Sequence, residues 1–409
     1  MSQVDAEAGR VKAKRVSVFE IFRTFLALGF TSFGGPIAHL GYFREEFVTR
    51  KKWLDDRVYA DLVALCQFTP GPASSKVGIG IGLAKGGLPG AFAAWLAFTA
   101  PSAIALLLFA WGVDAFADNL DAGWLHGLKV VAVAVVAQAV WGMAKNLCPD
   151  AQRFTLAVVA SVIAMLWPTS LGQVGAIAVG GMVGVLFLGA KRDDTHVTMN
   201  ISLGKTAGAI SLSLFFVLLA GLPLAASLYP NQPLALFDSF YRAGSLVFGG
   251  GHVVLPLLQS EVVPTGWVSN DAFLAGYGAA QAVPGPLFTF AAYLGAMMGP
   301  EPSGWQGALL CIVAIFLPAF LLTIGVLPFW DDLRRFGAVR SALVGVNAAV
   351  VGLLLAALYN PVWTSAIKAP ADFGLGLAAF ALLVFWKMPA WLVVILSALA
   401  GWGTESLVR

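Results

Sequence analysis

Charged side chains are scarce in this sequence. Lys, Arg, Asp and Glu together make up 11% of its 409 residues, whereas hydrophobic residues make up 59% and the mean hydropathy is +0.82. Soluble globular proteins carry roughly 25% charged residues, so this composition excludes an ordinary soluble domain. We attribute the formal net charge of +3 to cations in the loops of the protein, and we predict no nucleic-acid partner.

Cysteine is also scarce. Cys66, Cys148 and Cys311 form no CxxC pair and have no Cys/His spacing of a metal site, so we interpret them as small buried residues and expect no metal or cofactor. The chain has no G-x-x-x-x-G-K-S/T phosphate loop that would bind ATP. The ionisable residues within its apolar segments are scattered. A membrane-embedded enzyme, which needs clustered acids or a His/Asp constellation, is therefore an alternative that we do not favour.

Apolar runs, in contrast, are abundant. Each is long enough to span a bilayer, which takes roughly 20 residues, and clear examples cover residues 91–112, 128–145, 172–190, 207–228, 307–327 and 342–358. The basic segment 1–15 reads as a cytoplasmic tail. The run that follows it carries Glu20 and Arg23, which argues against a cleaved signal peptide. We expect a multi-pass protein of the cytoplasmic (inner) membrane with its N-terminus in the cytoplasm.

A pattern of glycine and proline occurs twice in the chain. Phe33-Gly34-Gly35 is followed 37 residues on by Pro70-Gly71-Pro72, and Phe248-Gly249-Gly250 is followed 36 residues on by Pro284-Gly285-Pro286. Trp53 matches Trp267, and Gln67 matches Gln281, at an offset of 214 positions. The chain therefore contains two repeats, which we place at residues 16–190 and 231–409. Residues 191–230 form a linker with one odd transmembrane helix.

The two repeats differ in charge. The first holds five cations between its motifs, at Arg44, Arg50, Lys51, Lys52 and Arg57, whereas residues 259–271 of the second hold none. Because basic loops stay cytoplasmic, the two copies should face opposite sides of the membrane. Inverted repeats with interrupted helices are typical of secondary transporters.

The predicted fold is an all-α polytopic membrane protein with two inverted-topology repeats. Each repeat has two interrupted re-entrant helical hairpins and about four transmembrane helices, and one linking transmembrane helix joins the repeats. In a rival topology each interrupted segment crosses completely, which gives 13 crossings. It would put the basic segment around Lys51 outside, against the positive-inside rule.

The breaks in the helices are the predicted binding site. Irregular backbone at membrane depth must line a cavity or be buried in protein. The N-terminus of a half-helix carries unpaired N–H groups and roughly half a positive charge, so several of them would suit a small oxyanion. The predicted substrate-binding residues are Gly34, Gly35, Pro36, Gln67, Pro70, Gly71, Pro72, Ser74, Ser75, Lys76, Gly249, Gly250, Gly251, His252, Gln281, Pro284, Gly285, Pro286 and Thr289.

Other polar residues in or beside these segments are candidates for gating or coupling, namely Arg23, His39, Glu46, Arg242 and Glu261. Each has a structural alternative. The arginines could snorkel to an interface, the histidines could be hydrogen-bonded packing residues, and Glu46 could belong to a solvated ion-pair network. The paired glycines could also serve only close helix packing.

The motifs together resemble the chromate ion transporter family in its long, two-domain form. The resemblance extends over essentially the whole chain and is carried by Phe30-Thr31-Ser32-Phe33-Gly34-Gly35-Pro36, Trp53-Leu54, Pro70-Gly71-Pro72, Phe248-Gly249-Gly250-Gly251-His252 and Pro284-Gly285-Pro286. It implies a bacterial or archaeal inner-membrane protein that exports chromate and confers chromate resistance.

Sulfate is a tetrahedral dianion like chromate, so a transporter of sulfate or another small oxyanion is the alternative that the resemblance leaves open. An anion channel would fit the repeats as well. The expected partners are the oxyanion and the lipid bilayer. The sequence does not decide the oligomeric state, although a homodimer is common among transporters of this build.

Overall fold

The described part of the protein is entirely helical. This computed structural model describes residues 15–115, 123–189, 203–248, 251–333 and 336–408, and no strand occurs among them. Within these ranges five helical segments are long and apolar enough to cross a membrane: Ala73–Val113, Gly123–Leu147, Lys205–Leu228, Gly304–Phe329 and Gly337–Ala366. Shorter apolar helices accompany them. The chain is therefore an α-helical polytopic membrane protein, as its composition predicts.

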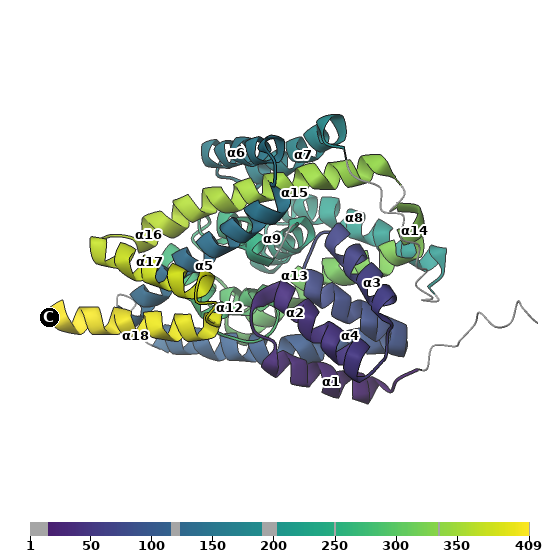
Figure 1. Cartoon of the computed structure of the whole chain (residues 1–409), viewed down its shortest axis with the longest axis horizontal. Coiled ribbons are helices and arrows are strands. Elements are labelled where there is room, and N and C mark those ends of the chain that lie inside the picture. The colour runs from purple at the N-terminus through teal and green to yellow at the C-terminus, as the bar shows by residue number, and fades with distance from the viewer. Residues whose placement is uncertain (1–14, 116–122, 190–202, 249–250, 334–335, 409) are drawn as a thin grey trace, which may run out of the picture.

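Two breaks interrupt the helices at the start of the first repeat, whose elements are coloured purple to blue in Figure 1. Helix α1 (Val18–Thr31) is followed by α2 (Gly35–Arg44) and a short π-helical segment, η1 (Glu45–Arg50). Helix α3 (Asp56–Phe68) precedes α4 (Ala73–Ala115), which kinks at Gly87, where φ is +67°. The breaks coincide with the Phe-Gly-Gly and Pro-Gly-Pro motifs. Pro36 lies in the first turn of α2, and Pro72 directly precedes α4.

The second repeat has a comparable series of helices, divided into more pieces. Helix α9 (Gln232–Leu246) is followed by η3 (Gly251–Val253) and α10 (Val254–Val262), and then come α11 (Asn270–Ala280), η4 (Leu287–Thr289), α12 (Phe290–Ala296) and α13 (Gly304–Val326). Pro286 caps η4. Gly71 and Gly285, at the centres of the two Pro-Gly-Pro motifs, have φ values of +102° and +103°. Glycine adopts this conformation without the steric cost of a Cβ atom, which explains its place in both copies.

The chain reverses its direction at each break. In the first repeat, Glu20 at the start of α1 pairs with Lys51 beyond the end of η1, at 3.1 Å, and the rings of Phe25 and Phe43 lie 5.5 Å apart. In the second repeat the Tyr293 hydroxyl on α12 donates to the Ala272 carbonyl at the start of α11, at 2.8 Å. The two helices on either side of a break therefore lie against each other rather than end to end.

The remaining helices of each repeat pack against the other repeat. Helix α5 (Gly123–Leu147) lies against α17 (Pro370–Val384) and α18 (Ala390–Val408), whereas α15 (Gly337–Ala357) lies against α6 (Ala151–Leu166) and α7 (Ser170–Phe187) (Figure 1). Glycines permit these close approaches. A Cβ atom on Gly127 would lie 2.2 Å from the Ser397 carbonyl, and one on Gly352 would lie 2.0 Å from that of Ala157. Because helices of each repeat pack against helices of the other, the two repeats form one packed unit.

The contacts also give the directions of these helices. His126 pairs with Asp372 near the starts of α5 and α17, and both helices later line the same cavity, so they run in the same direction. Helix α18 runs opposite to α5, because Gly127 approaches Ser397 and Gly401 approaches Gly123. Figure 1 shows α15 running toward the short helix α16 (Thr364–Ala366), with α17 returning beneath it.

Helix α8 (Lys205–Leu228) lies between the two repeats along the chain. It packs along α13, where the Ser211 hydroxyl donates to the Leu321 carbonyl at 2.9 Å, and most of its remaining surface is exposed and apolar. This helix falls within the predicted linker.

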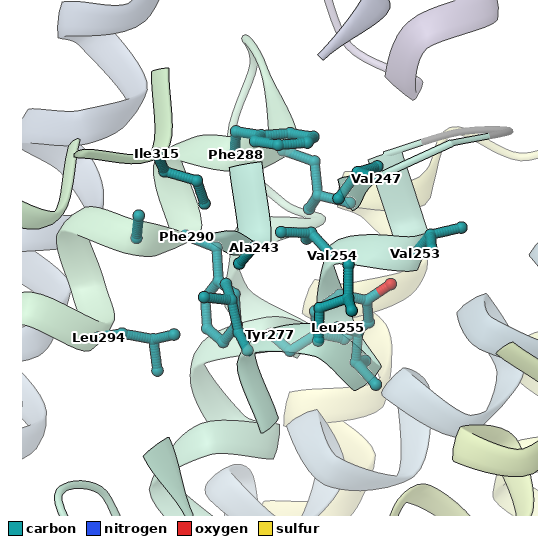
Figure 2. Close-up of a cluster of buried hydrophobic side chains, with 14 of the residues drawn as sticks. Ala243, Val247, Val253, Val254, Leu255, Tyr277, Phe288, Phe290, Leu294 and Ile315 are labelled. Atoms are coloured by element: carbon teal, nitrogen blue, oxygen red, sulfur yellow. The ribbon is translucent and has the colours of Figure 1, made fainter. Parts of the chain in front are cut away.

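A large cluster of buried hydrophobic side chains surrounds the Pro-Gly-Pro break of the second repeat. Side chains from α9, α10, α11, α12 and α13 fill this region in Figure 2, and Tyr277, Phe290 and Val254 are fully buried there. Phe290 occupies the position that Lys76 holds in the first repeat, and Lys76 is fully buried as well. The two repeats therefore have a similar backbone order but chemically different interiors.

Candidate functional site

Two reciprocal hydrogen bonds join the breaks of the two repeats. The Gly285 amide of the second Pro-Gly-Pro donates to the Ser32 carbonyl, just before the first Phe-Gly-Gly, at 2.9 Å. The Gly71 amide of the first Pro-Gly-Pro donates to the Val247 carbonyl, just before the second Phe-Gly-Gly, at 2.7 Å. These equivalent contacts join each Pro-Gly-Pro motif to the residue that precedes the Phe-Gly-Gly motif of the other repeat.

A cavity of about 460 Å³ opens beside these hydrogen bonds. Gly34 and Gly35 line it from the first repeat, and His252, Gln281 and Gly285 line it from the second. Helix α5 adds Gln138 and Trp141 to the wall, and the segment between α17 and α18 adds Lys387. The cavity therefore combines the start of a half-helix, two neutral amide side chains, an imidazole and an ammonium group.

Five of the predicted binding residues line the cavity, and the other described ones do not. The five are Gly34, Gly35, His252, Gln281 and Gly285. The described residues that do not line it are Pro36, Gln67, Pro70, Gly71, Pro72, Ser74, Ser75, Lys76, Gly251, Pro284, Pro286 and Thr289. Gly249 and Gly250 lie outside the described residues.

Gln281 has an unused donor at this cavity. Its side-chain nitrogen Nε2 is buried and has no hydrogen-bond partner among the described residues. A buried polar group without a partner costs roughly 1–3 kcal/mol, so such a group is an informative exception. An oxyanion in the cavity would supply the missing acceptor.

The two histidines that follow the glycines have different surroundings. His39 Nε2 lies 3.1 Å from the Ser32 carbonyl, and Nδ1 lies 3.3 Å from the Ser74 hydroxyl. Because a carbonyl can only accept, Nε2 carries the proton and both nitrogens are occupied. His252 Nδ1 lies 2.7 Å from the Tyr277 hydroxyl, which leaves Nε2 free of described partners at the cavity. His39 holds two segments together, whereas His252 can contact a ligand.

The ammonium group of Lys76 is fully engaged inside the protein. It donates to the carbonyl and hydroxyl oxygens of Thr69 at 2.5 and 2.7 Å, and to the Pro70 carbonyl at 2.8 Å. An ammonium group has three hydrogens, so none remains for an anion in this conformation. Lys76 therefore provides hydrogen bonds to the carbonyl groups just beyond the end of α3, and its predicted contact with a substrate stays a prediction.

The hydroxyl groups near the Pro-Gly-Pro motifs are also turned inward. Ser74 contacts His39, and Thr289 donates to the Pro286 carbonyl at 2.7 Å. Ser75 Oγ is buried and has no hydrogen-bond partner within the described ranges. Of these three, Ser75 alone keeps an unsatisfied donor, but it does not line the cavity.

Four of the five candidate gating residues form two clusters of charged side chains, one in each repeat. Arg242 binds Glu261 through Nη1 and Oε1 at 2.9 Å and also pairs with Asp238 at 2.8 Å. In the first repeat Glu46 pairs with Arg50, and Arg23 lies beside this pair in a separate cavity. The two glutamates thus occupy corresponding positions but have different arginine partners.

Several cavity residues were absent from the sequence-based prediction. Gln138 is a polar residue within an otherwise apolar run, which was a usable signal. Trp141 and Lys387 carried no comparable signal, because they lie outside the aligned motifs. No group of three or more His, Cys, Asp or Glu side chains that could hold a metal ion occurs in the described part of the chain.

Comparison with known proteins gives a consistent result. The family model described as "Chromate transporter" matches residues 19–185 and 234–402. The chain is similar to the chromate transport protein of Pseudomonas aeruginosa, with 28% identity over 94% of this chain and 91% of that protein. It is 26% identical to the chromate transport protein of Cupriavidus metallidurans, over 92% of this chain and 90% of that protein.

An uncharacterized transporter of Methanocaldococcus jannaschii is also 26% identical, over 95% of this chain and 90% of that protein. No solved structure matches the chain. The two segments matched by the family model correspond to the two halves whose breaks meet at the cavity.

Proposed function

The chain belongs to the chromate transporter family, and we propose that it is a secondary transporter that exports chromate across the cytoplasmic membrane. The observation that carries this proposal is the central cavity, where the first Phe-Gly-Gly break faces His252, Gln281 and Gly285 of the other repeat. Similar proteins of Pseudomonas aeruginosa and Cupriavidus metallidurans are named chromate transport proteins.

Neutral donors would hold the anion in the cavity. The backbone N–H groups at the start of α2 would point their positive dipole end at the anion, and the amides of Gln138 and Gln281 and the imidazole of His252 would add hydrogen bonds. Lys387 would provide a full charge at the same wall. Gln67 and the first Pro-Gly-Pro would form the counterpart surface, which meets the anion when the protein opens to the other side.

We place the two repeats in inverted orientations, at residues 16–190 and 231–409, with residues 1–15 as the cytoplasmic tail and residues 191–230 as the linker. The helix directions support this arrangement. Helices α5 and α17 run in the same direction, and α17 returns beneath α15 (Figure 1), so α5 and its counterpart α15 run in opposite directions.

The half-helices support the re-entrant arrangement. Helices α1, α2 and α3 have 14, 10 and 13 residues, which corresponds to about 21, 15 and 20 Å at 1.5 Å per residue. The hydrocarbon core is about 30 Å thick. Each piece is therefore too short to cross alone, and the reversal of direction at each break returns the chain to the side from which it entered.

The cavity should open to the cytoplasm in this conformation. It lies along the second halves of α5 and α17, near Lys387 and near Lys145, whose ammonium group lies 4.5 Å from the Trp141 ring. Cations mark the cytoplasmic side. At the opposite ends of these helices, His126 pairs with Asp372 at 2.7 Å and Lys129 pairs with Asp271 at 3.3 Å. These pairs would close the outer side.

The membrane potential favours export of a dianion. Each elementary charge gains about 2.3 kcal/mol per 100 mV, so a dianion leaving an inside-negative cell gains roughly 4.6 kcal/mol. That corresponds to more than a thousandfold concentration ratio. Export therefore needs no ATP, whereas uptake would require a coupling ion.

The experiment that tests the proposal is chromate uptake into inside-out membrane vesicles that contain the protein, with sulfate as competitor. Saturable chromate accumulation that sulfate blocks only weakly is expected. Transport of sulfate or another oxyanion without chromate flux would replace the substrate and favour the alternative transporter. A flux that does not saturate in the low-millimolar range would instead favour a channel, in which both sides open together.

A further inference from the structure

A second cavity of about 330 Å³ lies on the first repeat, between α1 and η1. Its wall contains three cations, Arg23 from α1 together with Arg50 and Lys51 at the end of η1, and one carboxylate, that of Glu46. It shares no residue with the central cavity. The proposed transport path does not use it.

The charges in this second cavity do not cancel. Arg50 pairs with Glu46 at 2.5 Å, and Lys51 pairs with Glu20 at 3.1 Å. Arg44 is occupied nearby by Asp56, and its hydrogen bond holds the pKa of that carboxyl below the usual value. Arg23 has no ion pair or hydrogen bond with any residue in the described ranges. One guanidinium group therefore remains in excess.

Arg23 also lies on an apolar exposed face. Phe19 and Phe30, one turn before and two turns after it on α1, have exposed fractions of 73% and 60%, and Ala27 between them is exposed. In a membrane protein such a face contacts lipid. A cation on a lipid-facing surface is costly unless an anion accompanies it, and arginine binds phosphate oxygens in a bidentate manner.

The corresponding place in the second repeat has no excess cation. Glu261, the counterpart of Glu46, is bound by Arg242 through two hydrogen bonds of 2.9 and 3.0 Å. No further Lys or Arg follows in residues 259–271. At this place an excess cation therefore occurs in the first repeat and not in the second, and the basic segment of the first repeat is predicted to face the cytoplasm, where the leaflet is anionic.

We propose that the Arg23–Arg50–Lys51 cavity binds the phosphate group of an anionic phospholipid, whose acyl chains lie along Phe19 and Phe30. The exposed aromatic side chains on either side of Arg23 favour a lipid over a free phosphate ion, because a soluble ion makes no use of an apolar surface. The site is separate from the chromate cavity. A protein that binds this lipid but moves another oxyanion would therefore leave the proposal intact.

The test measures phospholipid binding to the full-length protein by native mass spectrometry, with phosphatidylglycerol added to protein in a phosphatidylcholine background. Arg23→Gln should lower phosphatidylglycerol affinity at least tenfold, and Arg23→Lys should lower it less. The matched control is Arg57→Gln, which removes an exposed arginine that does not line the cavity, and it should change affinity less than twofold.

Competition with inorganic phosphate distinguishes the two sources of the ligand. Millimolar phosphate should leave phosphatidylglycerol binding unchanged. If phosphate displaces the lipid, or binds the wild type and fails to bind Arg23→Gln, the cavity is an ion site and the lipid proposal is wrong. Equal lipid affinities for Arg23→Gln and Arg57→Gln would also overturn it.

Discussion

Gly285 combines two constraints that a larger residue cannot meet. Its φ is +103°, and a Cβ atom there would lie 2.7 Å from the Ser102 hydroxyl oxygen. An L-residue in the left-handed region costs roughly 1–2 kcal/mol. Gly285→Ala should therefore displace the Gly285–Ser32 hydrogen bond and lower chromate transport at least tenfold, measured in vesicles, while membrane insertion persists.

The control for Gly285→Ala is Gly299→Ala, because the nearest atom to a Cβ on Gly299 is 3.8 Å away. This variant should transport like the wild type. Gly71→Ala tests the counterpart position, where φ is +102° and the Gly244 carbonyl would lie 3.3 Å from the new atom. Wild-type transport by both Gly285→Ala and Gly71→Ala would contradict a role for these motifs.

The unpaired amide of Gln281 gives a second prediction. Gln281→Met keeps the approximate volume of the side chain but removes the buried donor that has no partner among the described residues. Thermal stability should stay equal or rise, because burying such a donor costs roughly 1–3 kcal/mol. The KM for chromate should rise at least fivefold. Gln306→Met, at an exposed position on α13, should change neither quantity. An unchanged KM in Gln281→Met would remove Gln281 from the binding site.

Substitution of Lys76 gives a third prediction. A structural role of Lys76 would appear as lower stability with an unchanged KM, whereas a binding role would appear as a higher KM at unchanged stability. Lys76→Met would leave the Thr69 and Pro70 carbonyls without their donor. The loss of buried, charge-assisted hydrogen bonds should lower the free energy of unfolding by about 3 kcal/mol, seen as a lower thermal midpoint in detergent. The KM of the remaining transport should stay the same. A raised KM at normal stability would instead mean that Lys76 binds the anion directly.

These residues show which parts of the site the sequence could predict. Gly34, Gly35, His252, Gln281 and Gly285 line the cavity and belong to motifs that occur twice. The engagement of Lys76 could not be predicted, because it depends on the exact path of the backbone at the Thr69–Pro70 break. Trp141 lies on α5 and Lys387 lies between α17 and α18, and these parts of the chain carry none of the repeated motifs.

For the helices, too, one part could be predicted from the sequence and another could not. Breaks at Phe-Gly-Gly and Pro-Gly-Pro follow from the conformational limits of glycine and proline, and they occur where the sequence predicts them. The exchange of α17 and α18 onto α5 does not follow from any local pattern. It depends on close approaches such as that of Gly127 to Ser397, whose partners lie in different repeats and leave no signal in hydropathy.

The pairing of helix ends opposite the cavity gives a fourth prediction. Lys129 on α5 and Asp271 on α11 lie 3.3 Å apart, and the lysine is largely buried. If a pair of about 1 kcal/mol holds the outer side closed, Lys129→Gln should increase the open population about fivefold. A cysteine placed at Gln138 should then react faster with an external, impermeant thiol reagent.

The double variant with Lys129→Asp and Asp271→Lys restores the opposite charges and should return the reaction rate toward the wild-type value. His126→Gln removes the neighbouring pair with Asp372 and should act in the same direction as Lys129→Gln. Identical labelling rates in all these backgrounds would mean that the two pairs do not close the outer side.

The proposed arrangement of the protein in the membrane is based on one asymmetry between the repeats. Five cations lie between the motifs of the first repeat, and none lies in residues 259–271 of the second. The elements in these two places correspond, since η1 precedes α3 as α10 precedes α11. Corresponding elements on opposite sides of a membrane are possible only if the repeats are inverted.

Thr49→Cys and Thr265→Cys test this arrangement at two exposed places, one near the end of η1 and one just after α10. The three native cysteines are buried, so the wild type should react slowly with an impermeant maleimide. In intact cells Thr265→Cys should react and Thr49→Cys should not, and in inside-out vesicles the order should reverse. Reaction of both from the same side would place the two segments together and overturn the inverted topology. The cytoplasmic opening of the cavity would then lose its support, because it is inferred from the same cations.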